Sequence, residues 1–345
     1  MIQTVLGKIN KEDMGITLPH EHIFIELTAF FEERPLADCK SPATAPVTMD
    51  KLGILSRDPY ALRDNLRYDD FETQLKEISR FKVRGGQTVV DVTMPGIGRN
   101  PQLLKRVAEE SGLHVVAGTG FYVSSTHPEE IAGMTTEEIA AIFVREIEEG
   151  MDGTDIKAGI IGEIGISEIF GDPERRVLEA AGIASIKTGK SVMVHINPWT
   201  ENGLEAAEIL LRTGVKPEKI AVCHIDVENR EDYILKLLNM GVYIEFDNFG
   251  KEYYVERDAR REGYGLFVQD TDRVRLVKKL IDMGFKKQIL LSCDVCLKNL
   301  LRTYGGWGYD HILTNIVPMM EDEGITKEDI RDMLIINPAE YLEER

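Results

Sequence analysis

The sequence predicts an α/β fold, a (β/α)8 TIM barrel that forms one domain over residues 1–345. Three observations predict it. Short apolar segments alternate with longer amphipathic segments, most of the longer segments end on glycine, and no linker, repeat or low-complexity tract divides the chain. Eight consecutive β–α units can close on themselves into a barrel because βαβ connections are right-handed. A doubly wound open sheet is the alternative that this alternation leaves open.

Strands are expected where Val, Ile and Leu follow one another almost without polar interruption. Parallel strands that are covered on both faces need such continuous apolar runs. The eight predicted strands are residues 15–25, 86–93, 114–122, 158–165, 191–197, 220–226, 242–248 and 289–296.

Helices are expected between the strands, where apolar residues recur with the spacing that places them on one helical face. Most of these segments end on glycine, which often follows the last residue of a helix because it tolerates a left-handed conformation. The predicted helices are residues 69–84, 101–112, 135–150, 173–189, 203–214, 229–241 and 270–284, with a closing helix at 309–323.

Two segments depart from this alternation. Residues 28–68 form a long insertion after the first strand and contain four prolines. A loop of this length in a compact domain is usually functional, so we expect it to serve the site or to act as a lid. Residues 3–10 are expected to form one arm of a small hairpin that returns over residues 14–17 and plugs the bottom of the barrel.

The charge balance excludes several functions. The chain has 41 Lys and Arg against 59 Asp and Glu, a formal net charge of −18. Binding to nucleic acid or to an anionic membrane requires clustered positive charge, so neither partner is expected. No apolar stretch is long enough for a secretion signal or a membrane span, and the four cysteines suit reduced thiols. We therefore expect a soluble, cytoplasmic protein whose partner is a small-molecule substrate.

Chemically capable side chains gather at the carboxyl ends of the predicted strands, where the active site of a barrel forms. Four of the seven histidines lie there, although a lone histidine at a strand end is more often structural than a ligand. Within His20-x-His22 both side chains point to the same face of the strand and can reach one ion. The candidate metal ligands at these strand ends are His20, His22, Glu163, His195, His224 and Asp294.

This set of donors predicts two divalent metal ions, for which zinc is suited, because one ion would not need four histidines and two carboxylates. We assign the first two histidines and Asp294 to one ion and the last two histidines to the other, with Glu163 as the bridge. Two such ions lower the pKa of a shared water toward about 7 and so supply a hydroxide nucleophile. Asp294 is the candidate catalytic residue, which orients the hydroxide and passes its proton to the leaving group.

Further motifs accompany these candidate ligands along the chain. These motifs are residues 3–7, 118–122, 152–154, 156–165 and 308–315. Together with the candidate ligands in His20-Glu21-His22, Gly162-Glu163, His195, His224 and Asp294, they form one pattern along the chain. Over nearly the whole chain this pattern resembles the phosphotriesterase family of the amidohydrolase superfamily. The resemblance implies a barrel with a binuclear metal centre, usually zinc, that hydrolyses esters, lactones, amides or organophosphates. It places the ion bound by His20, His22 and Asp294 deeper than the other, and it makes a homodimer plausible.

The strand at residues 158–165 departs from many members of that family, which bridge their metals with a carboxylated lysine. This strand has no lysine after Lys157, which lies at its beginning and so on the opposite face of the barrel. Glu163 is the substitute, as in the branch that uses glutamate. The resemblance is strongest to phosphotriesterase-related proteins of that branch, whose animal members resemble N-acyl-taurine amidases, while more distant relatives include sugar-lactone hydrolases. An acyl substrate, either an amide or a lactone or ester, is therefore expected in preference to a phosphate triester.

The loops at the mouth of the barrel are expected to determine the substrate specificity. Tyr122 ends the third predicted strand and either donates a hydrogen bond into the pocket or caps the rim. Positive side chains after the seventh and eighth strands could hold a sulfonate, carboxylate or phosphate, although solvated surface charge is the ordinary explanation for each of them alone. They are Lys251, Arg257, Lys298 and Arg302.

Two other classes of protein remain as alternatives. A metal-free barrel enzyme with a Schiff-base lysine needs a lysine in the middle or at the end of a strand, and the predicted strands have none. A binding protein that kept the barrel but lost turnover is the second, against which the presence of Asp294 argues. Cys293 and Cys296 form a CxxC pair, but no second pair exists, so packing explains them better than metal or redox chemistry.

Overall fold

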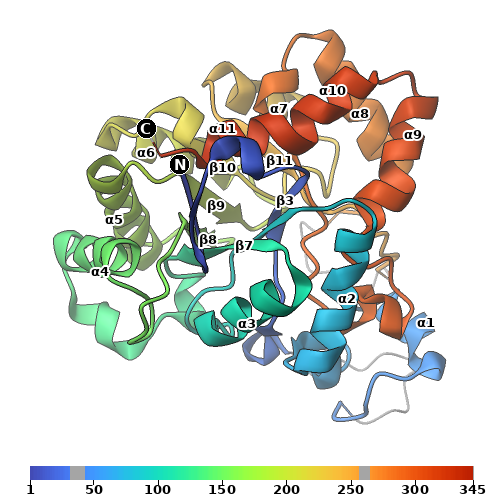
Figure 1. Cartoon of the computed structure of the whole chain (residues 1–345), viewed down its shortest axis with the longest axis horizontal. Helices are drawn as coiled ribbons and strands as arrows, with labels where there is room; N and C mark the ends of the chain where they lie inside the picture. The colour runs from blue at the N-terminus through green and yellow to red at the C-terminus, as the bar shows by residue number, and fades with distance from the viewer. Residues whose placement is uncertain (32–42, 256–264, 345) are drawn as a thin grey trace.

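Eight parallel strands form the centre of the computed structural model, which describes residues 1–31, 43–255 and 265–344. The strands follow one another around the sheet in chain order, and helices surround them (Figure 1). The fold is the predicted (β/α)8 barrel. Its strands are β3 (Thr17–Glu21), β6 (Thr88–Asp91), β7 (His114–Thr119), β8 (Ile160–Ile166), β9 (Val192–Ile196), β10 (Ile220–Val222), β11 (Tyr243–Phe246) and β12 (Ile289–Leu291).

Side chains complete the junction between the first and last strands of the barrel. The Ser292 hydroxyl accepts a hydrogen bond from His20 N at 3.2 Å and lies 2.7 Å from His20 O. The Glu21 carboxylate accepts hydrogen bonds from the backbone N–H groups of Cys293 and Val295 at 2.9 and 2.8 Å. These contacts satisfy backbone groups that would otherwise remain unpaired at the two sheet edges. Burial raises the pKa of Glu21 to about 7, although these backbone hydrogen bonds oppose the increase.

The helices begin and end where the sequence provides capping residues. Thr135 and Glu138 form a reciprocal capping box, and Asn100 accepts a hydrogen bond from Leu103 N. Gly189 follows its helix in the left-handed conformation, with φ 74°, as the glycine pattern predicts. The helices between the strands are α2 (Phe71–Val83), α3 (Pro101–Ser111), α4 (Thr136–Glu148), α5 (Asp172–Thr188), α6 (Asn202–Thr213), α7 (Glu231–Asn239) and α8 (Asp270–Asp282).

The chain after β12 is more helical than predicted. A π-helical turn (Ile312–Ile316) leads into α9 (Val317–Asp322), where the sequence predicts one regular helix. Two further helices, α10 (Lys327–Arg331) and α11 (Asn337–Leu342), were not predicted, and a second π-helical turn joins them. Such turns add a residue to the helical repeat and so interrupt the periodic pattern on which the prediction depends.

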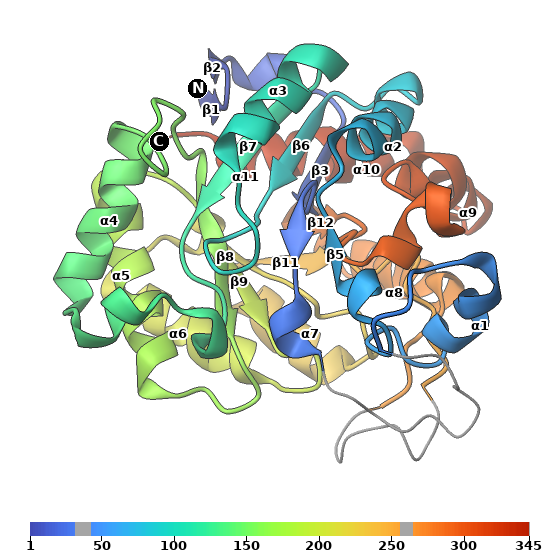
Figure 2. The same cartoon turned by 90° about the horizontal axis from the view of Figure 1, so that it is seen from below.

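Both chain ends close the bottom of the barrel. Strands β1 (Ile2–Thr4) and β2 (Gly7–Ile9) pair with each other, so the predicted return over residues 14–17 is wrong. Gly7 has φ 117°, which lets the chain reverse early. Ile2 and Met14 nevertheless pack with residues of the barrel interior, as does Tyr341 of α11, so the predicted plug is confirmed. Figure 2 shows β1 and β2 at one end of the barrel and α1 (Leu52–Leu55) at the other.

The long insertion after the first strand leaves and rejoins the barrel as an antiparallel pair. Strand β4 (Ile25–Glu26) pairs with β5 (Arg67–Tyr68), and the Tyr68 hydroxyl donates a hydrogen bond to His22 O at 3.0 Å. Val47, Leu55 and Leu62 form a small apolar cluster of their own within the insertion. The described part of the insertion is therefore anchored directly beside a predicted metal ligand.

Several strands are shorter than predicted because the backbone turns where the functional residues begin. β10 and β12 end at residues 222 and 291, although apolar residues continue beyond both. His224 and Asp294 adopt left-handed conformations, with φ 57° and 43°, and a residue in this conformation cannot continue a regular strand. Among the described residues, no helix has both the length and the apolar character needed to cross a membrane.

Candidate metal centre

The Glu163 carboxylate lies at the centre of the four predicted histidine ligands. Its Oε2 atom is 3.4 Å from His20 Nε2, 3.3 Å from His195 Nδ1 and 3.7 Å from His224 Nε2. Its Oε1 atom is 3.4 Å from His22 Nε2. These residues come from four different strands or strand ends, and only the closed barrel brings them together. The structure therefore assembles the predicted group around the residue predicted to bridge it.

Asp294 completes the group from the end of β12. Its Oδ1 atom is 3.2 Å from His22 Nε2 and 3.8 Å from His20 Nε2. Its Oδ2 atom forms an ion pair with the Lys251 ammonium. The left-handed conformation of Asp294 turns its carboxylate into the mouth of the barrel, and that of His224 does the same for its imidazole.

The groups behind the ligands hold the imidazole rings in place. His20 Nδ1 lies 3.3 Å from Glu245 Oε2, and His224 Nδ1 lies 3.0 Å from Asp247 Oδ1. His22 Nδ1 lies 2.9 Å from the Thr93 hydroxyl. When the Nδ1 atom is occupied in this way, the Nε2 atom is left as the one that can bind a metal. Sequence reasoning missed these three partners.

A signal for two of these partners is present in the sequence. Glu245 and Asp247 are two residues apart in an otherwise apolar run, and both are fully buried in the structure. Acidic residues are almost never fully buried without a partner, so their place in a predicted inner strand points to a polar group inside the barrel.

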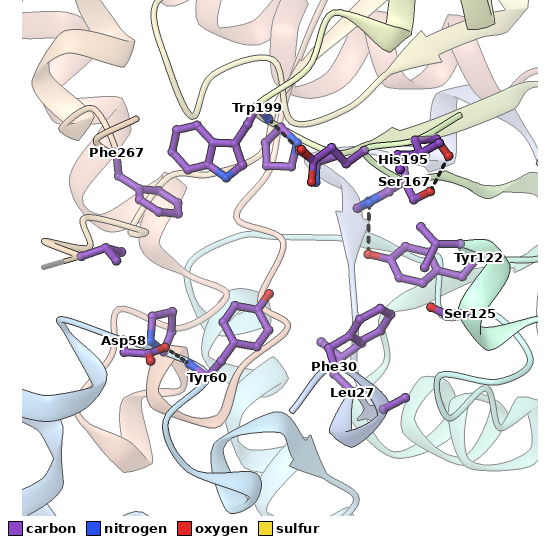
Figure 3. Close-up of a pocket in the computed structure, with 18 of the residues that line it drawn as sticks. Leu27, Phe30, Asp58, Tyr60, Tyr122, Ser125, Ser167, His195, Trp199 and Phe267 are labelled. Atoms are coloured by element: carbon purple, nitrogen blue, oxygen red, sulfur yellow. Dashed lines mark hydrogen bonds between the residues drawn. The ribbon is translucent and has the colours of Figure 1, made fainter. Parts of the chain in front are cut away.

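His195 is held differently from the other three histidines. Its Nδ1 atom faces Glu163 and lies 2.8 Å from His224 Nε2. The Tyr122 hydroxyl lies 3.2 Å from the Nε2 atom of His195, and the two rings meet edge to face with centroids 4.5 Å apart (Figure 3). Tyr122 therefore points into the pocket, which is the first of its two predicted positions.

The electrostatics of the centre follow from burial and from the density of charges. Burial by itself would lower the pKa of His22 and His224, but hydrogen bonds that His22 donates to Asp294 and Glu163 raise the pKa of His22 to about 9, and Asp247 raises that of His224 to about 10. Burial would raise the pKa of Glu163, but His20 and His195 hold it well below its usual range. The raised pKa values of the two histidines show that the surrounding carboxylates favour positive charge at these donor atoms.

The donor atoms fit a metal ion. His20 Nε2 and Glu163 Oε2 are both buried without a hydrogen bond, although they face each other across the centre. Buried polar atoms normally have a partner, and a divalent cation would satisfy both of these. Four groups of donors among the described residues could each hold an ion, one of them formed by His20 with Cys223, Glu245 and Asp247. The other three overlap and contain only predicted ligands. They are His20, His22 and Glu163; His20, His224 and Asp294; and Glu163, His195 and His224.

A small cavity of about 130 Å³ opens above the metal centre. Its wall includes Lys251, which is buried, and Cys296, whose Sγ atom is 3.8 Å from Asp294 Oδ2. Burial would lower the pKa of Lys251, but Asp294 raises it well above its usual range, so the side chain is positively charged. Of the predicted positive residues that the structure describes, Lys251 is therefore the one that lies at the centre.

The structure does not bring Lys298 or Arg302 to the centre. The ammonium of Lys298 is 2.5 Å from Asp64 Oδ1 in the insertion. The guanidinium of Arg302 lies 3.3 Å from Asp310, and Nε donates to Trp307 O. Neither residue lines either described cavity, because acidic or carbonyl partners hold both side chains elsewhere. Arg257 lies outside the described residues.

Comparison with known proteins identifies the family. The model of the family described as the phosphotriesterase family matches residues 1–342. The chain belongs to the phosphotriesterase family. It is accordingly a hydrolase, and phosphotriesterase-family hydrolases typically use a binuclear metal centre, for which this chain carries the donors.

Individual proteins are similar to this chain over nearly their whole length. The N-acetyltaurine hydrolase of Danio rerio is 37% identical over 352 residues, which cover 99% of this chain and 97% of the relative. The N-acetyltaurine hydrolase of Xenopus tropicalis is 35% identical over 343 residues, with the same coverage. The crystal structure of a resiniferatoxin-binding protein from Rhodobacter sphaeroides superposes with a TM-score of 0.95 at 31% identity, covering 99% of this chain and 94% of that one.

Proposed function

We propose that this protein is an amidase that hydrolyses N-acyl derivatives of small anionic amines at a centre of two divalent metal ions. The observation that carries the proposal is the position of Glu163, whose carboxylate lies within 3.7 Å of nitrogen atoms from all four histidines. A carboxylate in that position can bridge two ions, with His20, His22 and Asp294 on one and His195 and His224 on the other. Zinc suits imidazole and carboxylate donors of this kind.

The two ions, when bound, would polarise the scissile carbonyl and lower the pKa of water. Side chains of the protein would transfer the proton and stabilise the developing negative charge. Asp294 takes a proton from the attacking water and returns it to the nitrogen of the departing amine. The Tyr122 hydroxyl faces the pocket beside His195 and can donate a hydrogen bond to the oxygen on which negative charge develops.

The position of Lys251 supports the proposal that the substrate is anionic. It is the Lys or Arg side chain that lines the small cavity, as far as the structure describes that cavity, and its charge lies beside Asp294. A sulfonate or carboxylate on the amine half of the substrate could share this ammonium. The similarity to N-acetyltaurine hydrolases, whose named substrate carries a sulfonate two carbons from its amide nitrogen, supports the same reading.

The same lysine favours a second candidate, a sugar-lactone hydrolase whose substrate carries a phosphate. Asp294 would transfer a proton to the leaving oxygen of the lactone, and Lys251 would bind the phosphate in place of the sulfonate. A barrel that binds ligands without turning them over is the third candidate, and the resiniferatoxin-binding relative supports it.

The test is a hydrolysis assay on the purified chain reconstituted with zinc. N-acetyltaurine, N-decanoyltaurine and a phosphorylated sugar lactone would be supplied separately, with release of amine or acid as the readout. Asp294→Asn and chelator-treated protein are the controls. Amide turnover that both controls abolish is the expected result. Turnover of the lactone alone would favour the second candidate, and binding without turnover of any substrate would favour the third.

A further inference from the structure

A second, larger cavity of about 630 Å³ lies outside the metal centre. Its walls are mainly apolar and aromatic, and Figure 3 shows the rings arranged around an open space. They come from both ends of the insertion, from the loops after β7, β8 and β9, and from residues 265 and 267 before α8. The large apolar side chains that define it are Leu27, Phe30, Tyr60, Tyr122, Trp199 and Phe267.

This outer cavity is continuous with the metal centre. His195, Tyr122 and Phe267 line both it and the small cavity above the ions. A substrate whose carbonyl is held at the centre can therefore extend one of its two halves past these shared residues into the larger space. The outer cavity belongs to the same site and receives part of the same molecule.

Charge decides which half of the substrate enters which cavity. The small cavity contains Lys251, which attracts an anion. The outer cavity is lined by the exposed carboxylate of Glu168 and, among the described residues, by no Lys or Arg. An anionic amine placed there would meet like charge and lose the attraction of Lys251. The acyl half of the substrate is therefore the half that faces outward.

Size then decides what kind of acyl group fits. An acetyl group adds one methyl beyond the carbonyl, which is close in volume to the roughly 30 Å³ that a water molecule occupies. The outer cavity is many times larger, and its aromatic rings would remain exposed to water around so small a group. Ile169 lines its rim and is 84% exposed, so apolar surface continues to the edge. Such a surface is typical of a site that covers a large apolar group.

We infer that the outer cavity binds the acyl group of the substrate and selects chains of about six carbons or more, or acyl groups that carry an aromatic ring. This inference rests on the proposed amidase function and names its substrate class. It predicts that N-acetyl compounds are poor substrates for this chain, because they leave the outer cavity unfilled.

A series of substrates with one amine and increasing acyl length tests the inference. N-acetyl-, N-hexanoyl- and N-decanoyltaurine would be compared on the zinc-loaded protein by their kcat/KM values. Burying a methylene group improves binding by about fourfold, and the hexanoyl group has four more methylenes than the acetyl group, so the hexanoyl compound should exceed the acetyl compound by roughly 250-fold. A kcat/KM that is equal or highest for the acetyl compound would overturn the inference and leave the amidase proposal intact.

Two neighbouring serines provide a matched pair of variants. Ser125 is exposed and lines the outer cavity, whereas Ser124 is also exposed but lies outside the lining. Ser125→Trp should reduce kcat/KM for the decanoyl compound at least tenfold and that for the acetyl compound less than twofold. Ser124→Trp should change neither. Equal effects of both variants, or an equal loss for both substrates, would contradict the assignment of this cavity.

The two proposals can fail separately. If no amide in the series is hydrolysed, the amidase function is wrong, and calorimetric titration then compares the binding of N-decanoyl- and N-acetyltaurine. Tighter binding of the decanoyl compound that Ser125→Trp weakens would keep the outer cavity as the apolar subsite. Equal affinity for the two compounds would overturn it.

Discussion

The Asp294 carboxylate divides its two oxygens between two partners: Oδ1 lies 3.2 Å from Nε2 of His22, and Oδ2 forms an ion pair with Lys251. One oxygen thus faces the candidate metal centre, and the other faces Lys251, which we propose binds the anionic group of the substrate. Burial would raise the pKa of Asp294, but Lys251 and His22 keep it below its usual range. Asp294 is therefore an ionised carboxylate that lies between the candidate metal centre and Lys251.

Asp294→Asn should lower turnover far more than it lowers metal content. The amide keeps an oxygen that can contact an ion but cannot accept and return a proton, so kcat should fall by about 10²- to 10⁴-fold. Steady-state kinetics and elemental analysis on the same preparation make the comparison. A loss of metal in proportion to the loss of rate would show that Asp294 is a ligand without a separate catalytic role.

Lys251→Met should weaken the binding of anionic substrates. We expect KM for an N-acyltaurine to rise at least tenfold, because a buried charge-assisted contact is lost. The KM for a neutral N-acyl amide should change much less. Lys298→Met is the matched control, since Lys298 pairs with Asp64 and lies away from both cavities. An equal rise in KM in both variants would contradict the role of Lys251.

Asp247→Ala should weaken metal binding although Asp247 is not assigned as a ligand. Asp247 accepts a hydrogen bond from His224 N at 3.0 Å and contacts His224 Nδ1 at 3.0 Å, so its loss frees the ring to rotate. Zinc affinity should fall about 10- to 100-fold in a competition titration against a chromophoric chelator. Unchanged affinity would show that His224 is oriented without Asp247.

Asp270 should make stability depend on pH. Burial would raise its pKa, but a 2.7 Å hydrogen bond from His311 and the charge of Arg273 lower it below 3.8. A lowered pKa means that the carboxylate stabilises the fold above pH 3.8 and that this stabilisation is lost as the pH falls below that value.

Asp270→Asn tests this dependence. At pH 7 it should reduce the free energy of unfolding by about 3 kcal/mol, because Arg273 remains buried with a partner removed. The difference from the parent chain should shrink below about pH 4, where the parent loses the same charge. Urea unfolding at several pH values measures both quantities. A difference that stays constant down to pH 3 would contradict the account.

The fold and the gathering of the six candidate metal ligands at one end of the barrel could be predicted because they depend on local sequence patterns. Continuous apolar runs indicate the strands, and the carboxyl ends of parallel strands meet at one end of a barrel. His20 and His22 could be paired from spacing alone, since alternate residues share a face. Glu163 followed from its place at the end of the fourth strand and from the absence of a lysine there.

The remaining features depend on contacts between distant segments. The partner of Lys298 is Asp64, 234 positions earlier, and nothing near residue 298 indicates that its charge is already paired. The left-handed backbone at His224 and Asp294 is imposed by the surrounding barrel and carries no local signal. The outer cavity combines side chains from at least four loops, so its volume follows only from the folded chain.

Elemental analysis of the purified protein shows whether the six candidate ligands hold metal ions. We expect about two divalent ions per chain after reconstitution with zinc, and loss of that content in Glu163→Ala and His22→Ala. The Glu163 variant should also lose activity, since it removes the bridge between the two sites. Equal metal content and rate in Glu163→Ala would exclude Glu163 as the bridge, and a parent chain that binds no metal after reconstitution with zinc or manganese would contradict the metal centre altogether.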